Sequence, residues 1–263
     1  MLFVDYYGII LLSIKGGMFM GELIAVLSGK GGTGKTTLCA ALATSLAHLG
    51  ETVLCIDCDV GLRNLDIALG LSEEGALSFA DIASGEYSLT MATAHPFFPG
   101  LQFLTAPMGC AAADVDFEGF ARLLAQARQQ FSYIFLDAPA GIEAGFSLAA
   151  QYADRVILVT NTDPASIRDA TQAGNVLEQM GKTNVRLIVN RIHKGTLDAM
   201  GLTVDDIMDK AGLPLLGIVP EDVNVVLAAA KGQPLIRASR GGAAAACRRI
   251  AKRITGQTVP VRL

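Results

Sequence analysis

The sequence contains no tryptophan and is poor in both aromatic and charged residues. Of its 263 residues, 6% are aromatic and 17% are charged, whereas 51% are hydrophobic. Alanine, valine, isoleucine and leucine are abundant, and there are 28 glycines. This composition is typical of a largely parallel β-sheet covered by helices. The net charge of −4 provides no excess of positive charge and argues against bulk nucleic-acid binding.

Cysteine and histidine are scarce and show no catalytic or metal-binding pattern. The five cysteines are widely spread and no secretion signal is evident, which favours a reducing cytoplasm. Cys55 and Cys58 lie three positions apart, and in a strand such positions point to opposite faces. With no second pair to complete a zinc site, we interpret both as small buried residues. His48, His95 and His193 are isolated, so we expect structural or surface roles for them.

The sequence also lacks a convincing membrane-spanning segment at its start. Residues 1–20 hold an apolar run, but Asp5 interrupts it and no basic region leads it. The run is shorter than the roughly 20 residues that a membrane span needs. We interpret residues 1–19 as an N-terminal extension and hypothesise that translation starts at Met18 or Met20, so that the residues before that start are not translated. N-terminal sequencing of the natural product tests this hypothesis.

Short apolar runs alternate with helical patterns along the rest of the chain. We predict strands at residues 22–28, 52–57, 101–106, 133–139, 155–160, 185–191 and 214–220. The clearest helical patterns cover residues 36–49, 117–130 and 164–180. This alternation predicts right-handed crossovers and one α/β domain with a mostly parallel, twisted sheet and helices on both faces. The domain covers residues 20–255, and residues 256–263 form a short C-terminal tail.

A glycine-rich segment lies between the first predicted strand and the first predicted helix. It fits the spacing G-x-x-x-x-G-K-[ST] and predicts a P-loop NTPase fold. Its glycines let backbone N–H groups face phosphates, and the helix adds its positive end. We expect Lys35 to reach the β- and γ-phosphates and Thr36 to bind Mg²⁺. The predicted nucleotide-binding residues of this segment are Gly29, Lys30, Gly31, Gly32, Thr33, Gly34, Lys35, Thr36 and Thr37.

Carboxylates follow two of the predicted strands. Asp57 and Asp59 stand at the carboxyl end of the second strand, where ligands of open α/β sheets bind. They can hold the water shell of Mg²⁺ and position an attacking water; the alternative is a solvated strand end. Asp137 follows four apolar residues, as in the strand that delivers a carboxylate to the metal of nucleotide hydrolases. Gly141 gives the next loop freedom to respond to the γ-phosphate.

Several segments together resemble the MinD/ParA family of ATPases, which have a deviant Walker A loop. The resemblance covers residues 23 to about 255 and rests on the segments KGGTGKTT, DCDVGLRNLDIALGL, DAPAGIEAGF, LIVNRI and LLGIVPED. The second and third segments are closer to the septum-site-determining branch than to the partition branch, whose second segment reads more like D-x-D-P-Q. The resemblance implies a cytoplasmic, Mg²⁺-dependent ATPase that dimerises on ATP and acts as a spatial switch in bacterial division-site placement. It also implies a division inhibitor and an ATPase activator as partners.

The resemblance assigns a role to the additional lysine, Lys30, at the front of the loop. In the family this lysine reaches across a nucleotide-sandwiched dimer to the partner subunit's ATP. The extra cation offsets the anionic charge that would keep two ATP-loaded faces apart. The alternative is a surface lysine that merely precedes a loop.

The resemblance also implies roles for other residues. Asp59 orients the attacking water and acts in catalysis with Lys35 and Lys30. The implied Mg²⁺ residues are Thr36, Asp57 and Asp137, and the implied adenine contacts are Asn190 and the backbone around Pro220.

The C-terminal segment departs from the pattern of the septum-site-determining branch, whose members end in a basic amphipathic helix that binds anionic lipid. Here the last helical stretch, residues 241–254, carries a basic cluster of Arg248, Arg249, Lys252 and Arg253, with few bulky apolar residues opposite. Pro260 prevents a regular helix at the extreme end. Lipid anchoring needs both charge and apolar area. The sequence is therefore compatible with a solvated helix face and with a membrane-binding helix. Peripheral association with the inner face of the cell membrane is therefore left open.

Other functions are weaker matches to the residues present. A sibling ATPase that positions flagella or another cargo would use the same chemistry, and a DNA-binding partition ATPase is disfavoured by the second acidic segment. An iron–sulfur reductase would need a cysteine soon after residues 137–141, yet none occurs between Cys110 and Cys247. A metal-cluster carrier would need a close cysteine pair near the C-terminus, and a tyrosine kinase of this loop type would need a tyrosine-rich tail. A binding module without hydrolysis is disfavoured because the lysines and aspartates occur together.

Overall fold

The fold is described by a computed structural model that covers residues 20–60, 62–71, 75–108 and 116–262. The predicted extension, residues 1–19, lies outside the described residues, so the hypothesis about the start site stays a prediction. No helix in the described ranges is long and apolar enough to cross a membrane.

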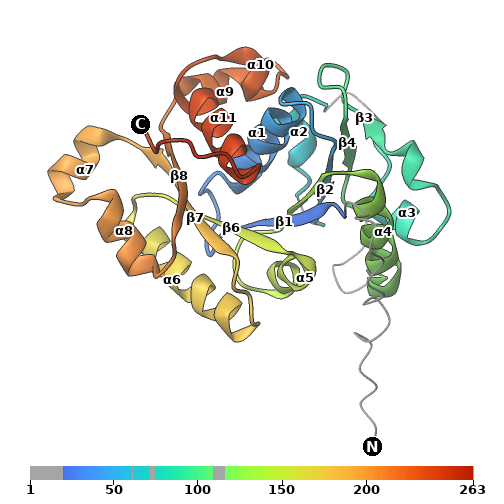
Figure 1. Cartoon of the computed structure of the whole chain (residues 1–263), viewed down its shortest axis with the longest axis horizontal. Coiled ribbons are helices and arrows are strands. Elements are labelled where there is room, and N and C mark those ends of the chain that lie inside the picture. The colour runs from blue at the N-terminus through green and yellow to red at the C-terminus, as the bar shows by residue number, and fades with distance from the viewer. Residues whose placement is uncertain (1–19, 61, 72–74, 109–115, 263) are drawn as a thin grey trace, which may run out of the picture.

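Within the described residues, eight strands form one sheet in the order β3-β4-β2-β5-β1-β6-β7-β8 (Figure 1). Of these strands, only β3 runs antiparallel to its neighbour; the other neighbouring pairs are parallel. The strands are β1 (Glu22–Leu27), β2 (Val53–Asp57), β3 (Thr93–Ala94), β4 (Leu101–Leu104), β5 (Tyr133–Asp137), β6 (Arg155–Thr160), β7 (Val185–Ile192) and β8 (Leu215–Pro220). The predicted sheet is confirmed.

Helices cover both faces of the sheet, as predicted (Figure 1). On one face lie α1 (Lys35–His48), α2 (Leu65–Leu69), α9 (Val223–Ala230), α10 (Leu235–Ala238) and α11 (Gly242–Ile254). On the other lie α3 (Phe79–Ala83), α4 (Phe117–Gln130), α5 (Ala144–Tyr152), α6 (Pro164–Gln179), α7 (Lys194–Met200) and α8 (Val204–Ala211). A short 3₁₀ turn, η1 (Leu89–Met91), precedes β3.

Each central strand supplies side chains to two separate cores. In β1, Leu23, Ala25 and Leu27 belong to one buried cluster, while Ile24 and Val26 belong to the other. This alternation follows from the period of two along a strand and explains why the strand reads as a continuous apolar run. The same rule places Cys55 and Cys58 in opposite clusters, both buried, as expected.

The sheet brings its functional carboxylates to a common edge. In the register of the parallel strands, Asp57 of β2 pairs with Asp137 of β5, and Asp137 is level with Val26 of β1. Because β1 ends one residue later, at Leu27, the glycine-rich loop begins beside both carboxylates.

The C-terminal helix packs its apolar side into the domain. The apolar side of α11 packs against α1 and β8, where Ala244, Cys247 and Ile250 are almost fully buried. Small side chains are needed there because the helix lies close to the sheet. The scarcity of bulky apolar residues therefore indicates tight packing inside the domain, whereas the basic side of α11 is partly exposed, and its role at a membrane stays a prediction.

Most of the basic cluster on α11 bonds to nearby backbone carbonyls. Arg253 donates to the carbonyl oxygens of Leu216, Val259 and Pro260, and Arg248 donates to those of three residues at positions 236–240. These contacts fasten the tail and the segment before α11 to the domain. Residues 256–262 form no regular helix, as Pro260 predicts.

Candidate functional site

The glycine-rich loop leaves β1 and enters α1 at a left-handed glycine. Gly34, the N-cap of α1, has φ 89°, a conformation that costs glycine little. No side chain caps the helix, so the first N–H groups of α1 stay available to an anion. An added Cβ at Gly34 would lie 2.3 Å from Asn190 Nδ2, so glycine is required there for space as well.

Asn190 of β7 anchors the glycine-rich loop through a side-chain hydrogen bond. Its Nδ2 donates to the carbonyl oxygen of Thr33 over 2.8 Å, and the side chain is buried. The adenine contact implied for Asn190 is untested, but the structure places this amide against the loop backbone. Thr33 itself is buried, and its hydroxyl has no hydrogen-bond partner among the described residues.

A buried ion pair joins the loop lysine to the strand carboxylate. Lys35 Nζ lies 3.2 Å from Asp137 Oδ1, with side-chain exposures of 7% and 1%. Burial raises the pKa of Asp137, an effect opposed by the Lys35 ammonium and by the hydroxyl of Thr36. Lys35 therefore neutralises a carboxylate that would otherwise be costly to bury.

Asp57 organises the loop that carries Asp59. Its two carboxylate oxygens accept hydrogen bonds from the backbone N–H groups of Asp59, at 2.9 Å, and Leu65, at 3.2 Å. Burial, reinforced by the charge of Asp137, raises the pKa of Asp57 to about 6, although the two N–H bonds favour its ionised form. Asp57 thus sets the path of the chain between β2 and α2.

Lys30 forms an ion pair within its own chain. Its Nζ lies 3.0 Å from Oδ2 of Asp163, and both side chains are nearly half exposed. The bond to Lys30 lowers the pKa of Asp163, which also caps α6 by accepting from the backbone N–H of Ser166. Exposed pairs of this kind contribute little to stability, so Lys30 can exchange partners readily.

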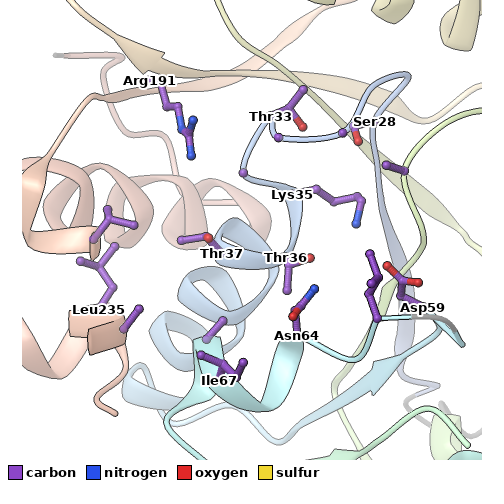
Figure 2. A pocket seen from close by; sticks show the side chains of 18 of the residues that line it. Ser28, Thr33, Lys35, Thr36, Thr37, Asp59, Asn64, Ile67, Arg191 and Leu235 are labelled. Carbon is purple, nitrogen blue, oxygen red and sulfur yellow. The ribbon is translucent and has the colours of Figure 1, made fainter. Parts of the chain in front are cut away.

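One pocket of about 400 Å³ is lined by most of the residues predicted to bind the nucleotide. Figure 2 shows Lys35, Thr36 and Asp59 around its space. The predicted residues that line it are Lys30, Gly31, Gly32, Thr33, Gly34, Lys35, Thr36, Thr37 and Asp59. Gly29 does not line it: its backbone packs against Asp169. Asp57 and Asp137 lie buried beneath the loop.

A second, smaller pocket adjoins the first at the start of α1. It is lined by Asn190 and Pro220 together with Gly34, Thr37 and Val225, and the last three also line the larger pocket. The residues predicted to contact adenine therefore lie together, at the end of the loop away from Lys30. Their contact with a base stays a prediction.

The residues present fit a magnesium nucleotide. The loop offers free N–H groups, the unpartnered Thr33 hydroxyl and two lysines, all suited to phosphate. No group of three or more His, Cys, Asp or Glu residues in the described ranges could hold a metal alone. Mg²⁺ does not require such a group, because it usually binds through one or two protein carboxylates together with substrate phosphates and water.

Two arginines near the site were not predicted from the sequence. Arg191 lines both pockets. Arg63 bonds through Nε to the hydroxyl of Thr105 over 2.7 Å, joining the Asp59 loop to the end of β4. Both have positive φ, 54° and 40°, which is uncommon for residues other than glycine. A backbone conformation of this kind has no signature in the sequence, so only the structure could reveal it.

Comparisons with known proteins agree with this geometry. The family model described as CobQ/CobB/MinD/ParA nucleotide binding domain matches residues 24–235. The chain is 36% identical over 244 residues to the septum site-determining protein MinD of Synechocystis, covering 92% of each chain.

Solved structures show the same likeness. A chain of the MinC:MinD cell division protein complex of Aquifex aeolicus superposes with a TM-score of 0.84 at 35% identity, covering 92% of this chain and 99% of that one. The septum site-determining protein MinD of Pyrococcus horikoshii, complexed with Mg-ADP, gives 0.79 at 26% identity, covering 89% and 96%.

Proposed function

Because the chain belongs to the CobQ/CobB/MinD/ParA nucleotide-binding family, we propose that it is a Mg²⁺-dependent ATPase that dimerises on ATP and acts as a spatial switch in bacterial division-site placement. One observation carries the proposal. A loop with lysines at both ends lines a single pocket with Asp59, in a chain that aligns with a septum site-determining relative over 92% of its length.

Lys35 binds the nucleotide by exchanging its partner. In the structure it neutralises Asp137, and with nucleotide present it turns to the β- and γ-phosphates. Thr36, Asp57 and Asp137 would hold the metal and its water shell. Bound magnesium supplies positive charge that offsets the charge on the phosphates. When Lys35 turns to the phosphates, the Asp137 carboxylate loses its ion-pair partner and would be available to the metal or its water shell.

Asp59 positions the attacking water. It lines the pocket on a loop whose backbone is held by Asp57, and its carboxylate can accept a proton from water placed beside the γ-phosphate. Its position therefore depends on the two backbone hydrogen bonds that Asp57 accepts.

Lys30 links nucleotide binding to dimerisation. Leaving Asp163, it reaches the phosphates held by a second copy of the chain and offsets the negative charge between the two faces. Hydrolysis then weakens that contact and resets the switch. The expected partners are a division inhibitor, as in the MinC:MinD complex, and an ATPase activator.

Co-sedimentation with the division inhibitor encoded in the same genome tests the division role. We expect a complex in ATP and Mg²⁺ but not in ADP, and none with Lys35→Ala. Normal ATP hydrolysis without this complex would contradict division-site placement. It would then favour the sibling role in positioning flagella or another cargo. A shift of random DNA that weakens steeply with salt would instead indicate a partition ATPase.

Membrane association needs a separate experiment, because the apolar face of α11 is buried in the domain. ATP-dependent sedimentation with anionic liposomes, with and without residues 256–263, tests it. Binding that disappears with the tail would locate the contact there, and binding that persists would locate it elsewhere. No sedimentation in either form would contradict a peripheral membrane role for this chain.

A further inference from the structure

Ser28 is a buried polar residue at the junction between β1 and the glycine-rich loop. Its exposed fraction is 0%, and it lies at the start of the loop among the residues around the pocket (Figure 2). A buried hydroxyl is costly unless it is hydrogen-bonded, so the partner that it has found indicates its role. The nucleotide contacts proposed for the loop do not use this hydroxyl.

The hydroxyl of Ser28 holds the backbone of the front lysine. Its Oγ donates to the carbonyl oxygen of Lys30 over 2.9 Å. This bond closes the bend of the chain at residues 29–30 and fixes the direction in which the lysine leaves the loop. The ion pair of Lys30 with Asp163 is exposed and contributes little, so the buried bond is the firmer of the two restraints.

Helix α6 packs directly against the same bend. A Cβ added to Gly29 would lie 2.3 Å from the carbonyl oxygen of Asp169, so no larger residue fits between the loop and the helix. Asp163 stands at the start of the same helix and meets the Lys30 side chain. The bend is therefore packed from outside by α6 and bonded from inside by Ser28.

The backbone of Ser28 connects this bend to the loop that follows Asp137. Gly141 donates its N–H to the carbonyl oxygen of Ser28 over 3.1 Å. Its φ of 94° is one that glycine adopts readily, so the loop can turn back onto the end of β1. One residue thus bonds the front lysine through its side chain and the loop after the strand carboxylate through its main chain.

We propose that Ser28 is a positioning residue for dimerisation, an inference that rests on the proposed ATP-dependent dimer. Its hydroxyl fixes the bend so that Lys30 is presented to the phosphates held by a second copy of the chain. Its carbonyl joins the bend to the loop after Asp137, so a change in that loop on ATP binding reaches the lysine. Ser28 acts through these two contacts and touches neither phosphate nor metal.

Sedimentation velocity over a concentration series in saturating ATP and Mg²⁺ tests the proposal. Every variant is made in the Asp59→Ala chain, so that hydrolysis does not dissolve the dimer. A hydrogen bond of this kind changes an equilibrium about fivefold, so a dimer that uses the bend of both copies should dissociate about 25-fold more readily in Ser28→Ala. MgADP affinity, measured by fluorescent-nucleotide titration, should stay unchanged, because Lys35 and the later part of the loop bind the nucleotide.

Two further variants and one further measurement separate the hydrogen bond from packing. Ser28→Cys nearly keeps the volume but offers only a weak donor, so it should weaken the dimer as Ser28→Ala does. Ser45→Ala is the matched control: it removes a buried hydroxyl of α1 that bonds the carbonyl oxygen of Ala41, and it should leave the dimer unchanged. Hydrogen exchange at the Gly141 amide should be unaltered in Ser28→Ala, because the carbonyl of residue 28 remains.

Any of four results would overturn the inference: an unweakened dimer in Ser28→Ala, an equal loss of MgADP affinity, full dimerisation of Ser28→Cys, or faster exchange at Gly141. A loss of dimerisation in Ser45→Ala as large as in Ser28→Ala would do the same, since it would indicate general destabilisation. An Asp59→Ala chain that stays monomeric in ATP without any change at Ser28 would instead contradict the proposed function.

Discussion

Lys35 and Asp137 carry opposite charges in a part of the protein where neither is exposed to solvent. Removing one partner of such a pair leaves the other buried and uncompensated, typically at a cost of about 3–5 kcal/mol. Because Asp137 can take up a proton, that cost should shrink as the pH falls.

We therefore expect Lys35→Ala to lose nucleotide binding and to lower the free energy of unfolding by about 3 kcal/mol at neutral pH. Fluorescent-nucleotide titration and urea denaturation measure the two effects. Lys194→Ala, at an exposed lysine of α7, should show neither. ATP binding of wild-type strength in Lys35→Ala would contradict the role of the loop.

Asp57 makes stability depend on pH. Its pKa is raised to about 6 in the folded protein, from an ordinary value of 3.8, so the folded state keeps the proton longer than the unfolded state. The contribution of this proton is fully present below pH 3.8 and is lost as the pH rises through 6.

The advantage of wild type over Asp57→Asn should accordingly decrease between pH 4 and 7, by up to about 3 kcal/mol at about 1.4 kcal/mol per pKa unit. Urea denaturation across this range measures the difference. Asp198→Asn, at an exposed carboxylate of α7, provides the control. A difference that is flat or grows with pH would show that folding does not raise the pKa of Asp57.

At the scale of elements, the N-terminus of α6 holds Lys30 through Asp163. Asparagine can also cap a helix but carries no charge, so Asp163→Asn should release Lys30 without disturbing α6. We expect ATP-dependent dimers to form at lower protein concentration in this variant. Sedimentation velocity over a concentration series measures the change. Weaker dimerisation with unchanged stability would contradict the idea that Asp163 competes for Lys30.

The contact of α11 with the sheet depends on Gly217 of β8. A Cβ added there would lie 2.5 Å from Cγ1 of Ile250, closer than side chains can approach. We expect Gly217→Ala to cost about 1–3 kcal/mol of unfolding free energy in wild type. In an Ile250→Ala background the same substitution should cost clearly less. Equal costs in a double-mutant cycle, measured by urea denaturation, would contradict the close packing of α11.

The sequence predicted elements best where the pattern was long and locally complete. The strand at 155–160 and the helix at 117–130 have the predicted bounds, and Asp116 caps the start of that helix. The antiparallel strand β3 was missed because two residues carry no periodicity.

The sequence pattern identified the loop, Asp59 and the two strand carboxylates. It gave no sign of the ion pairs of Lys30 and Lys35 or of the positive φ of Arg191, since these depend on distant segments and on backbone conformation.

At the scale of the whole molecule, the two lysines of the loop connect nucleotide binding with dimerisation. Lys30 and Lys35 each have a carboxylate partner within the chain, and each is free to leave it for phosphate. Only Lys30 is exposed enough to reach beyond its own subunit. The account therefore requires that ATP join two copies of the chain through this lysine.

Light scattering of Asp59→Ala in saturating ATP and Mg²⁺ tests that requirement most directly, because blocked hydrolysis should preserve the dimer. The account predicts about twice the 27.5 kDa monomer mass, with the monomer mass in ADP. Asp59→Ala combined with Lys30→Ala should stay monomeric while still binding ATP. A 27.5 kDa species for Asp59→Ala with ATP bound, at concentrations well above those in the cell, would contradict the account.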